Sequence, residues 1–230
     1  MKYWAVIPAA GVGARMGADR PKQYLELLGR TVIEHTLSRF LDHPAIAGVF
    51  VALGPQDGYW PQLPVAADAR ITRVEGGRER CHSVLNALRA ILAGPGQEED
   101  RVLVHDAARP CLRREDLDRL IEEAGATPEG GILAVPVRDT MKRAGAADAI
   151  DHTIDRNALW HALTPQLFPL GALHEALQSA LDAGHEVTDE ASAMEHAGYR
   201  PRLVRGHADN IKITLPEDLA LARFYLEQSA

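Results

Sequence analysis

The chain has 230 residues, of which 46% are hydrophobic and 25% are charged, and its formal net charge is -7. This composition is typical of a soluble globular protein, and the acidic balance disfavours binding to nucleic acid or to an anionic membrane surface. No apolar run reaches the ~18–20 residues that a membrane span requires, so we expect a cytoplasmic protein. The two cysteines, Cys81 and Cys111, lack the spacing of a zinc motif and are predicted to be free thiols.

Segments typical of buried strands alternate with segments typical of amphipathic helices between residues 3 and 137. Apolar runs predict strands at Tyr3–Pro8, Ala47–Leu53, Ile71–Val74, Arg101–His105 and Gly131–Val137. Apolar residues at helical spacing predict helices at Thr31–Leu41, His82–Leu92 and Arg113–Ala124. This alternation predicts an α/β fold of the Rossmann-like type, with a mostly parallel sheet and helices on both of its faces.

The sequence becomes polar between residues 138 and 164. Two strand-like pieces, Thr140–Arg143 and Ile150–Asp155, flank the turn-like segment AGAAD. We expect a β-arm, residues 138–164, that projects from a single domain spanning residues 1–230. Beyond the arm we predict helices at Leu170–Ala183, Thr188–His196 (capped by Thr188) and Pro216–Glu227. We predict short strands at Arg202–Arg205 and Ile211–Ile213.

A glycine-rich loop follows the first predicted strand, in the segment AVIPAAGVGARMGADRPKQ (residues 5–23). Small residues let backbone N–H groups approach a phosphate, and cations such as Arg15 and Lys22 neutralise its charge. Arg20, taken alone, is typical of a solvated surface charge. The glycine spacing fits neither the GxGxxG fingerprint of dinucleotide-binding proteins nor the GxxxxGK[ST] loop of P-loop enzymes. The loop therefore predicts a nucleoside triphosphate site of another kind.

The segment HDAARP (residues 105–110) follows the strand predicted at Arg101–His105. Ligands of open parallel sheets bind beyond the carboxyl ends of the strands. Asp106 is therefore placed to hold Mg²⁺ or a sugar hydroxyl, and Arg109 to meet a phosphate. Alternatively, Asp106 only caps the following turn, and His105 is more typical of a satisfied core histidine than of a ligand.

Two other segments have both a functional and a purely structural interpretation. GGRERCHSV (residues 76–84) is suited to backbone recognition of a nucleobase or ribose, but also to an ordinary glycine turn with Ser83 as the cap. Lys212 lies between two isoleucines in GHADNIKITL, a pattern that by itself is typical of a solvated lysine on a sheet edge.

Seven segments carry a resemblance to a known family, and they occur in this order over the whole chain: PAAGVGARMGADRPKQYLELLGRTVIEHTL, GGRERCHSV, VHDAARP, VRDTMKR, DRNALWHALTPQ, VTDEASAMEHAG and ADNIKITLPEDLALA. The chain resembles the 2-C-methyl-D-erythritol 4-phosphate cytidylyltransferases of the non-mevalonate isoprenoid pathway. These are nucleotidyltransferases with a glycosyltransferase-A-like fold. The resemblance implies that CTP and methylerythritol phosphate react to give the CDP-alcohol and pyrophosphate, with Mg²⁺ or another divalent cation as cofactor.

The resemblance also assigns residues to the two substrates. It assigns to the triphosphate Ala9, Ala10, Gly11, Gly13, Arg15 and Lys22. It assigns to the cytidine Gly76, Gly77, Ser83 and Ala107. It assigns to the alcohol phosphate Asp106, Arg109, Thr140, Thr188 and Lys212, and, from the partner subunit of a homodimer joined through the arm, Arg156 and Thr164. Arg15, Lys22 and Lys212 would be catalytic, and Asp106 is the one protein candidate for contact with the metal.

One residue departs from the family pattern on the cytosine side, because His82 stands where an aspartate is common. The resemblance further implies a chain without the fused cyclodiphosphate synthase domain of some relatives. Two alternatives stay open: a cytidylyltransferase for another polyol phosphate such as ribitol 5-phosphate, and a non-catalytic nucleotide-binding regulator. Retention of Arg15, Lys22 and Lys212 disfavours the regulator.

Overall fold

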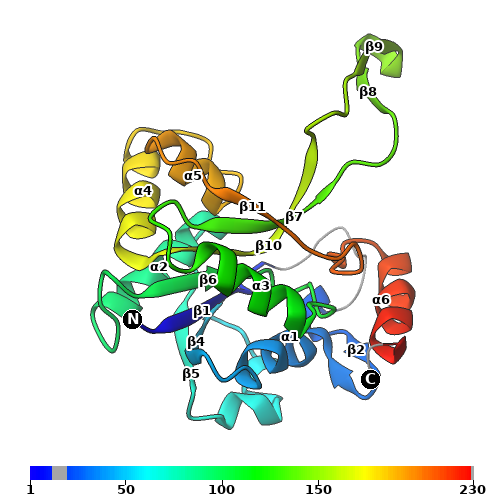
Figure 1. The fold of residues 1–230 in the computed structure, drawn as a ribbon. Helices are drawn as coiled ribbons and strands as arrows, with labels where there is room; N and C mark the ends of the chain where they lie inside the picture. The colour runs from blue at the N-terminus through cyan, green and yellow to red at the C-terminus, as the bar shows by residue number, and fades with distance from the viewer. Residues whose placement is uncertain (12–19, 229–230) are drawn as a thin grey trace.

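The computed structural model describes residues 1–11 and 20–228. Its centre is a seven-stranded sheet in the order β11-β7-β10-β6-β1-β4-β5 (Figure 1). These strands are β1 (Tyr3–Pro8), β4 (Ile46–Leu53), β5 (Ile71–Glu75), β6 (Arg101–Val104), β7 (Gly131–Pro136), β10 (Trp160–Pro169) and β11 (Arg202–Arg205). Strand β10 runs antiparallel to both of its neighbours, and all other pairs are parallel. The predicted α/β fold with a mostly parallel sheet is therefore confirmed.

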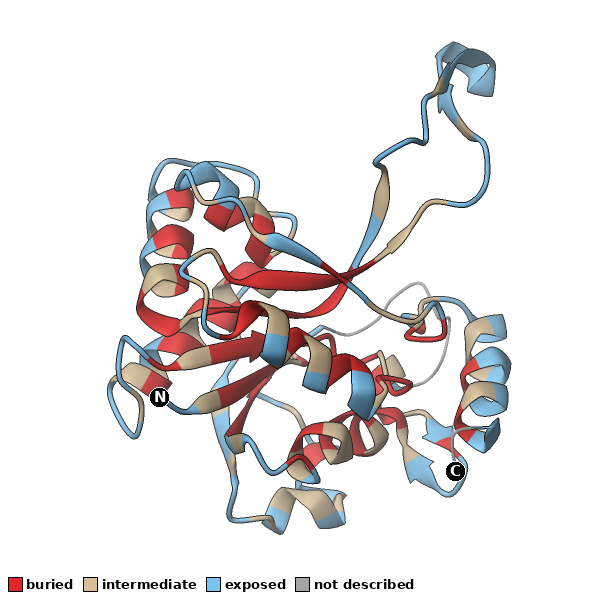
Figure 2. Ribbon diagram, in the orientation of Figure 1, coloured by how far each residue is buried: buried red, intermediate tan, exposed pale blue. Residues whose placement is uncertain are grey.

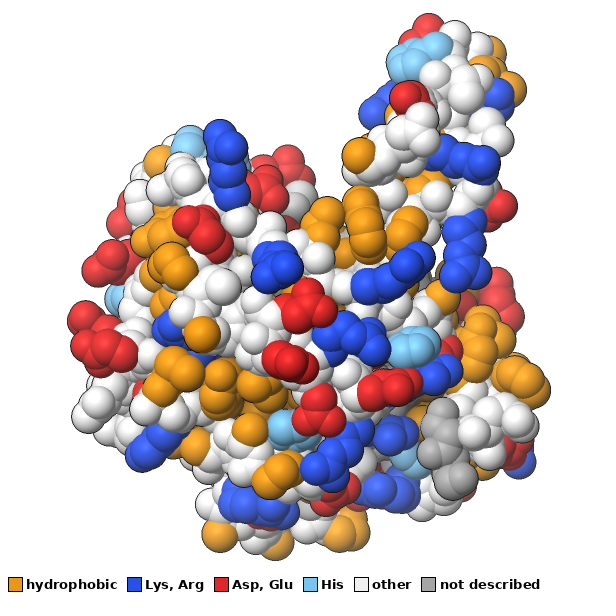
Figure 3. All heavy atoms as spheres, in the orientation of Figure 1, with side chains coloured by type: hydrophobic (Ala, Val, Ile, Leu, Met, Phe, Trp, Pro, Cys, Tyr) orange, Lys and Arg blue, Asp and Glu red, His pale blue; other side chains and the backbone are white. Residues whose placement is uncertain are grey.

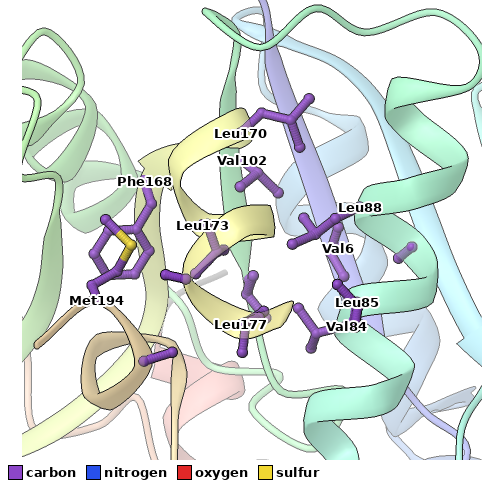
Figure 4. Close-up of a cluster of buried hydrophobic side chains, with 14 of the residues drawn as sticks. Val6, Val84, Leu85, Leu88, Val102, Phe168, Leu170, Leu173, Leu177 and Met194 are labelled. Atoms are coloured by element: carbon purple, nitrogen blue, oxygen red, sulfur yellow. The ribbon is translucent and has the colours of Figure 1, made fainter. Parts of the chain in front are cut away.

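Helices cover both faces of the sheet. They are α1 (Val32–Leu41), α2 (Arg80–Leu92), α3 (Arg114–Ala124), α4 (Leu170–Asp182), α5 (Glu190–His196) and α6 (Pro216–Gln228). In β1, Val6 packs into a cluster with residues of α2, α4 and α5, while its neighbours Ala5 and Ile7 pack into a second cluster with residues of α1 and α3. Figure 4 shows the first cluster, in which side chains of α2 and α4 meet across Val6. Alternate side chains of a strand point to opposite faces, which explains why β1 reads as a continuous apolar run.

Local sequence accounts for several element boundaries. Helix α1 begins after Thr31, whose backbone N–H and hydroxyl both donate to the Glu34 carboxylate at 2.8 and 2.7 Å. Helix α5 begins one residue later than predicted, because Asp189 rather than Thr188 is the N-cap and its carboxylate accepts from the Ser192 N–H at 2.9 Å. Both aspartate and threonine are good N-cap residues, so the sequence does not distinguish Asp189 from Thr188, and the prediction of Thr188 was wrong.

Two strand predictions require correction. The segment Ile211–Ile213 is not a strand; it is an irregular stretch that packs Ile213 against α6. Conversely, strand β10 enters the core within the segment predicted to be arm, although it contains Pro165 and Pro169. Prolines disfavour an inner strand, but the pairing of β10 with β7 is interrupted between Ala162 and Gln166, where Pro165 lies.

The arm is built on a two-stranded antiparallel sheet of β8 (Met141–Ala144) and β9 (Ile150–Ile154), and it extends away from the body (Figure 1). A second small hairpin is formed by β2 (Glu26–Leu27) and β3 (Arg30–Thr31), which the sequence did not predict. Figure 2 shows that burial is concentrated in the sheet and its helices, whereas the arm is exposed along most of its length.

The surface agrees with the acidic but mixed composition. On the face drawn in Figure 3, acidic and basic side chains are interspersed over the body, and hydrophobic side chains gather where the arm leaves it. Within the described residues, no helix is both long and apolar enough to cross a membrane. Cys81 and Cys111 are both free, as predicted, and both are buried.

Candidate active site

A cavity of about 210 Å³ lies beyond the carboxyl ends of β1, β5 and β6. It is lined by residues from separate segments of the chain: Pro8–Gly11, Lys22, Gln23, Gly77–Arg80, Ser83, Asp106–Ala108 and Lys212. The structure therefore brings together the four segments that the sequence analysis singled out. This edge is where open parallel sheets bind their ligands.

The backbone after β1 is held in place by residues outside the glycine loop. The Ala9 N–H donates to the Ala52 carbonyl at 2.8 Å, and the buried Gln23 amide donates to the carbonyls of Ala9 and Gly11 at 2.9 and 3.0 Å. Lys22, which begins the short 3-10 helix η2 (Lys22–Tyr24), donates from Nζ to the Ile213 carbonyl at 2.8 Å. Gly13 and Arg15 lie outside the described residues.

The turn that precedes α2 has room only for glycine. A Cβ on Gly76 would overlap the Cβ of Ala10, and a Cβ on Gly77 would overlap the side chain of His82. The Gly77 N–H donates to the Ser83 hydroxyl at 3.0 Å, and that hydroxyl donates to the Glu79 carbonyl at 3.1 Å. The turn is thus packed on the loop after β1, and its backbone faces the cavity.

Three cations surround the Asp106 carboxylate. One oxygen lies 3.0 Å from Arg80 Nε, and the other lies 2.9 Å from Lys212 Nζ and 3.4 Å from Arg109 Nε. Burial opposes ionisation of Asp106, but the three cations outweigh it and hold the pKa of the carboxyl well below its usual range. Lys212 is therefore not the solvated edge lysine of the simpler interpretation, because its ammonium group reaches a buried carboxylate.

Sequence reasoning missed Arg80 and Glu190. The Arg80 guanidinium also binds the fully buried Glu190 carboxylate through two N–H groups at 2.7 and 3.0 Å. Burial opposes the charge on Arg80, yet Glu190 and Asp106 raise the pKa of this guanidinium above its ordinary value. A buried carboxylate and its arginine are 110 positions apart, so no local pattern in the sequence could have paired them.

A buried network lies directly beneath the loop of Asp106. His105 Nε2 lies 3.0 Å from the Arg109 carbonyl, and His105 Nδ1 lies 3.0 Å from the Thr164 hydroxyl, which also accepts from the Asp106 N–H at 3.1 Å. Burial lowers the pKa of His105 to about 4, so the ring is neutral near pH 7. Because a carbonyl can only accept, Nε2 carries the proton and Nδ1 accepts from Thr164. His105 is thus the satisfied core histidine expected from its pattern.

The remaining predicted residues lie in different places. Thr164 is buried beside His105 and bonded within its own chain, while Arg109 donates to the Asn210 carbonyl at 2.7 Å next to Asp106. Thr140 and Arg156 are exposed on the arm and do not line this cavity, and Thr188 is exposed just before α5. Among the described residues that were predicted to bind substrate, those that line the cavity are Ala9, Ala10, Gly11, Lys22, Gly77, Ser83, Asp106, Ala107 and Lys212.

Whether the cavity could bind Mg²⁺ depends on which side-chain oxygens are available to ligate it. Both Asp106 oxygens already face cationic nitrogens, so this carboxylate does not fit Mg²⁺ as a ligand. Among the described residues, one cluster of potential metal ligands exists, formed by Glu79, Cys81 and His82. A thiolate and an imidazole suit softer metals than Mg²⁺, so this cluster does not supply the expected site either.

A mostly parallel α/β sheet, a small-residue loop after its first strand and cations gathered at the carboxyl edge define a nucleotidyltransferase fold. The family model of 2-C-methyl-D-erythritol 4-phosphate cytidylyltransferase matches residues 3–228. The chain belongs to this family.

Relatives support this assignment over almost the whole chain. The 2-C-methyl-D-erythritol 4-phosphate cytidylyltransferase of Ectopseudomonas mendocina is 60% identical over 222 residues, which cover 96% of this chain and 94% of the relative. That of Pseudomonas aeruginosa PAO1 is 60% identical over 217 residues, which cover 94% and 93% of the two chains.

Solved structures agree with the fold. A 4-diphosphocytidyl-2C-methyl-D-erythritol synthase superposes with a TM-score of 0.86 at 44% identity, covering 98% of this chain and 99% of its own. The cytidylyltransferase from Thermus thermophilus superposes with a TM-score of 0.79 at 34% identity, covering 99% of this chain and 100% of its own.

Proposed function

We propose that this protein transfers the cytidylyl group of CTP to 2-C-methyl-D-erythritol 4-phosphate and releases pyrophosphate, a step of isoprenoid precursor synthesis. The observation that carries the proposal is the cavity in which Lys22, Lys212 and Asp106 meet the Gly77 turn, in a chain of this family. Both substrates are phosphorylated, and a site for two anions requires such a local concentration of cations in an acidic protein.

In this proposal the triphosphate lies against the loop after β1 and the cytidine against the turn before α2. The small residues Ala9, Ala10 and Gly11 let phosphate oxygens approach this backbone, although the Ala9 N–H itself already donates to the Ala52 carbonyl at 2.8 Å. We also assign Gly13, Arg15 and Lys22 to the triphosphate. Gly76, Gly77, Ser83 and Ala107 hold the cytidine. The fixed Gly77 turn supports this assignment, because a preorganised backbone costs little entropy when the ligand binds.

The alcohol phosphate binds on the other side of Asp106. Asp106, Arg109, Thr188 and Lys212 come from the same chain, and Arg156 comes from the arm of a partner subunit in a homodimer. The resemblance placed Thr140 with Asp106 in the same chain, but Thr140 is exposed on the arm and outside the cavity lining, so we assign it to the partner's arm as well. We assign Thr164 a supporting role within its own chain, because its hydroxyl is already engaged by His105 and Asp106.

The chemistry follows from charge. A substrate phosphate oxygen attacks the α-phosphorus of CTP, a new P–O bond forms, and the bond to pyrophosphate breaks with its electron pair on the leaving group. The phosphate nucleophile is ionised near neutral pH, so no general base is needed. The chain must instead hold two mutually repelling anions in line and stabilise the charge of the transition state. Arg15, Lys22 and Lys212 supply this stabilisation.

Lys212 has a second role in this scheme. Its ammonium group lies 2.9 Å from Asp106, within reach of a phosphate placed beside that carboxylate. The alcohol phosphate would share this lysine with Asp106 and so bring its own oxygen toward the α-phosphorus. A divalent cation would enter with the triphosphate of CTP, and we assign it no protein ligand and no step.

Release of pyrophosphate from CTP and methylerythritol phosphate tests the proposal, with ribitol 5-phosphate as the competing alcohol. If ribitol 5-phosphate were the only alcohol that reacts, the protein would instead be a cytidylyltransferase for another polyol phosphate. Binding of CTP without turnover of either alcohol would instead support a regulator. Light scattering on the pure protein tests the homodimer, and fractionation of cells tests the cytoplasmic location.

A further inference from the structure

We infer that Arg80 is a positioning residue that couples the nucleotide side of the cavity to the alcohol side. This inference rests on the residue assignments of the proposed function. Arg80 begins α2, directly between the Gly77 turn and Ser83, which we assign to the cytidine. Its guanidinium contacts Asp106, which we assign to the alcohol, and Glu190, which lies two residues after Thr188.

The geometry uses the whole guanidinium fork. Arg80 Nη1 and Nη2 lie 2.7 and 3.0 Å from the two oxygens of Glu190, and Nε lies 3.0 Å from Asp106. Glu190 is fully buried, whereas the Arg80 side chain is 29% exposed at the cavity. Lysine has no planar fork and cannot bind two carboxylates in this way. The contact is therefore specific to arginine.

Glu190 links Arg80 to the segment that carries Thr188, because it binds Arg80 and lies two residues after Thr188. It is the first residue of α5, after the N-cap Asp189. From the other side, the Gln166 amide donates to the Asp189 carboxylate at 2.8 Å, and its oxygen accepts from the Ala191 N–H at 2.8 Å. The start of α5 is thus held between Gln166 on β10 and Arg80 on α2, and the exposed Thr188 is attached to it.

The charges of this cluster favour a phosphate. Arg80, Arg109 and Lys212 are three cations, and Asp106 and Glu190 are two carboxylates, so one positive charge remains uncompensated. A cytidine bound against the Gly77 turn would contact the first turn of α2 and favour the conformation in which Arg80 contacts Asp106 and the start of α5. The alcohol phosphate would bind to this same conformation, so by linkage each substrate would strengthen the binding of the other.

The experiment is calorimetric binding of the alcohol phosphate with and without a CTP analogue whose α,β-bridging oxygen is a methylene group. Methylerythritol phosphate should bind the wild-type protein at least about fivefold more tightly when the analogue is present. Arg80→Lys should reduce this ratio to within about twofold of one, measured at analogue concentrations that saturate the variant. A folded Arg80→Lys variant that keeps the full ratio would overturn the inference.

Two further variants separate this inference from a loss of folding or of the assigned site. Glu190→Gln keeps a hydrogen-bond acceptor and should also lower the ratio, so it decides the matter if Arg80→Lys does not fold. Arg89→Gln, an exposed position of the same helix, should keep the wild-type ratio. Asp106→Asn tests the assignment itself: unchanged binding of the alcohol phosphate would refute the site, whereas weaker binding together with an intact ratio in Arg80→Lys would refute only the coupling.

Discussion

Two carboxylates at and beneath the cavity are buried and paired, whereas most polar and charged groups of the projecting arm are exposed. Asp106 and Glu190 are buried, and each is bound by cations from distant parts of the chain. Thr140 and Arg156 on the arm are exposed, and β8 and β9 pair only with each other in their small sheet. Buried charges that are already paired cost no reorganisation when a substrate binds. In the proposed function, the paired charges of the body would lower the barrier, and the exposed arm of a second subunit would add affinity for the alcohol phosphate.

The largest expected effect lies in the body. Lys22→Ala should lower kcat by roughly 10²–10³, the scale for the loss of one preorganised charge-stabilising donor. Steady-state release of pyrophosphate at saturating concentrations of both substrates measures this change.

Arg20→Ala is the matched control for Lys22→Ala, since Arg20 is an exposed cation two positions away and outside the cavity lining. Its kcat should equal that of the wild type. A Lys22→Ala variant with near wild-type kcat would show that Lys22 does not stabilise the transition state. The proposed difference in role between the body and the arm would then be wrong.

The same contrast separates what the sequence could and could not predict. Strands such as β1 and β4 were predictable because their apolar runs are local signals. The cavity was predictable in outline because each glycine or charged segment follows a strand at the same edge of the sheet. Strand β10 was missed because it begins within the polar segment 138–164 that was assigned to the arm. The register interruption that accommodates Pro165 depends on the pairing with β7.

Contacts between distant segments were beyond local patterns. The pairing of Arg80 with Glu190, and the role of Gln23 in bracing the carbonyls of Ala9 and Gly11, arise only when the chain is folded. Lys212 was ambiguous for the same reason, because its distance to Asp106 depends on the irregular segment that replaces the predicted strand at Ile211–Ile213.

An intermediate effect is expected beneath the cavity, on the pH dependence of stability. His105 has a folded-state pKa of about 4, against about 6.5 when unfolded. Between these values the unfolded chain binds more protons than the folded one, so stability falls as the pH falls from 6.5 toward 4. From pH 7 to pH 5 this group alone should lower the free energy of unfolding by about 2 kcal/mol.

Urea unfolding of the wild type and of His105→Gln at both pH values isolates this contribution from that of the other histidines. The variant should lose about 2 kcal/mol less than the wild type between pH 7 and pH 5. Equal losses in the two proteins would mean that His105 is accessible to protons in the folded state. The Asp106 loop would then be less rigidly supported than the contrast with the arm requires.

The smallest expected effect lies in the arm. Arg156→Ala should raise KM for the alcohol phosphate about tenfold, equivalent to about 1.4 kcal/mol of lost binding, and leave kcat and the KM for CTP unchanged. Its free energy of unfolding should stay within about 0.5 kcal/mol of the wild type, because exposed substitutions have little effect on stability. Two-substrate kinetics and urea unfolding measure these quantities.

Arg143→Ala is the control on the same arm, since Arg143 is an exposed cation of β8 that we assign to neither substrate. Its KM for the alcohol phosphate should match that of the wild type. If Arg156→Ala instead changed only the KM for CTP, the arm would serve the nucleotide half of the site. A partner subunit would then complete the binding of CTP, and the division of labour between a preorganised body and an affinity-supplying arm would have to be reversed.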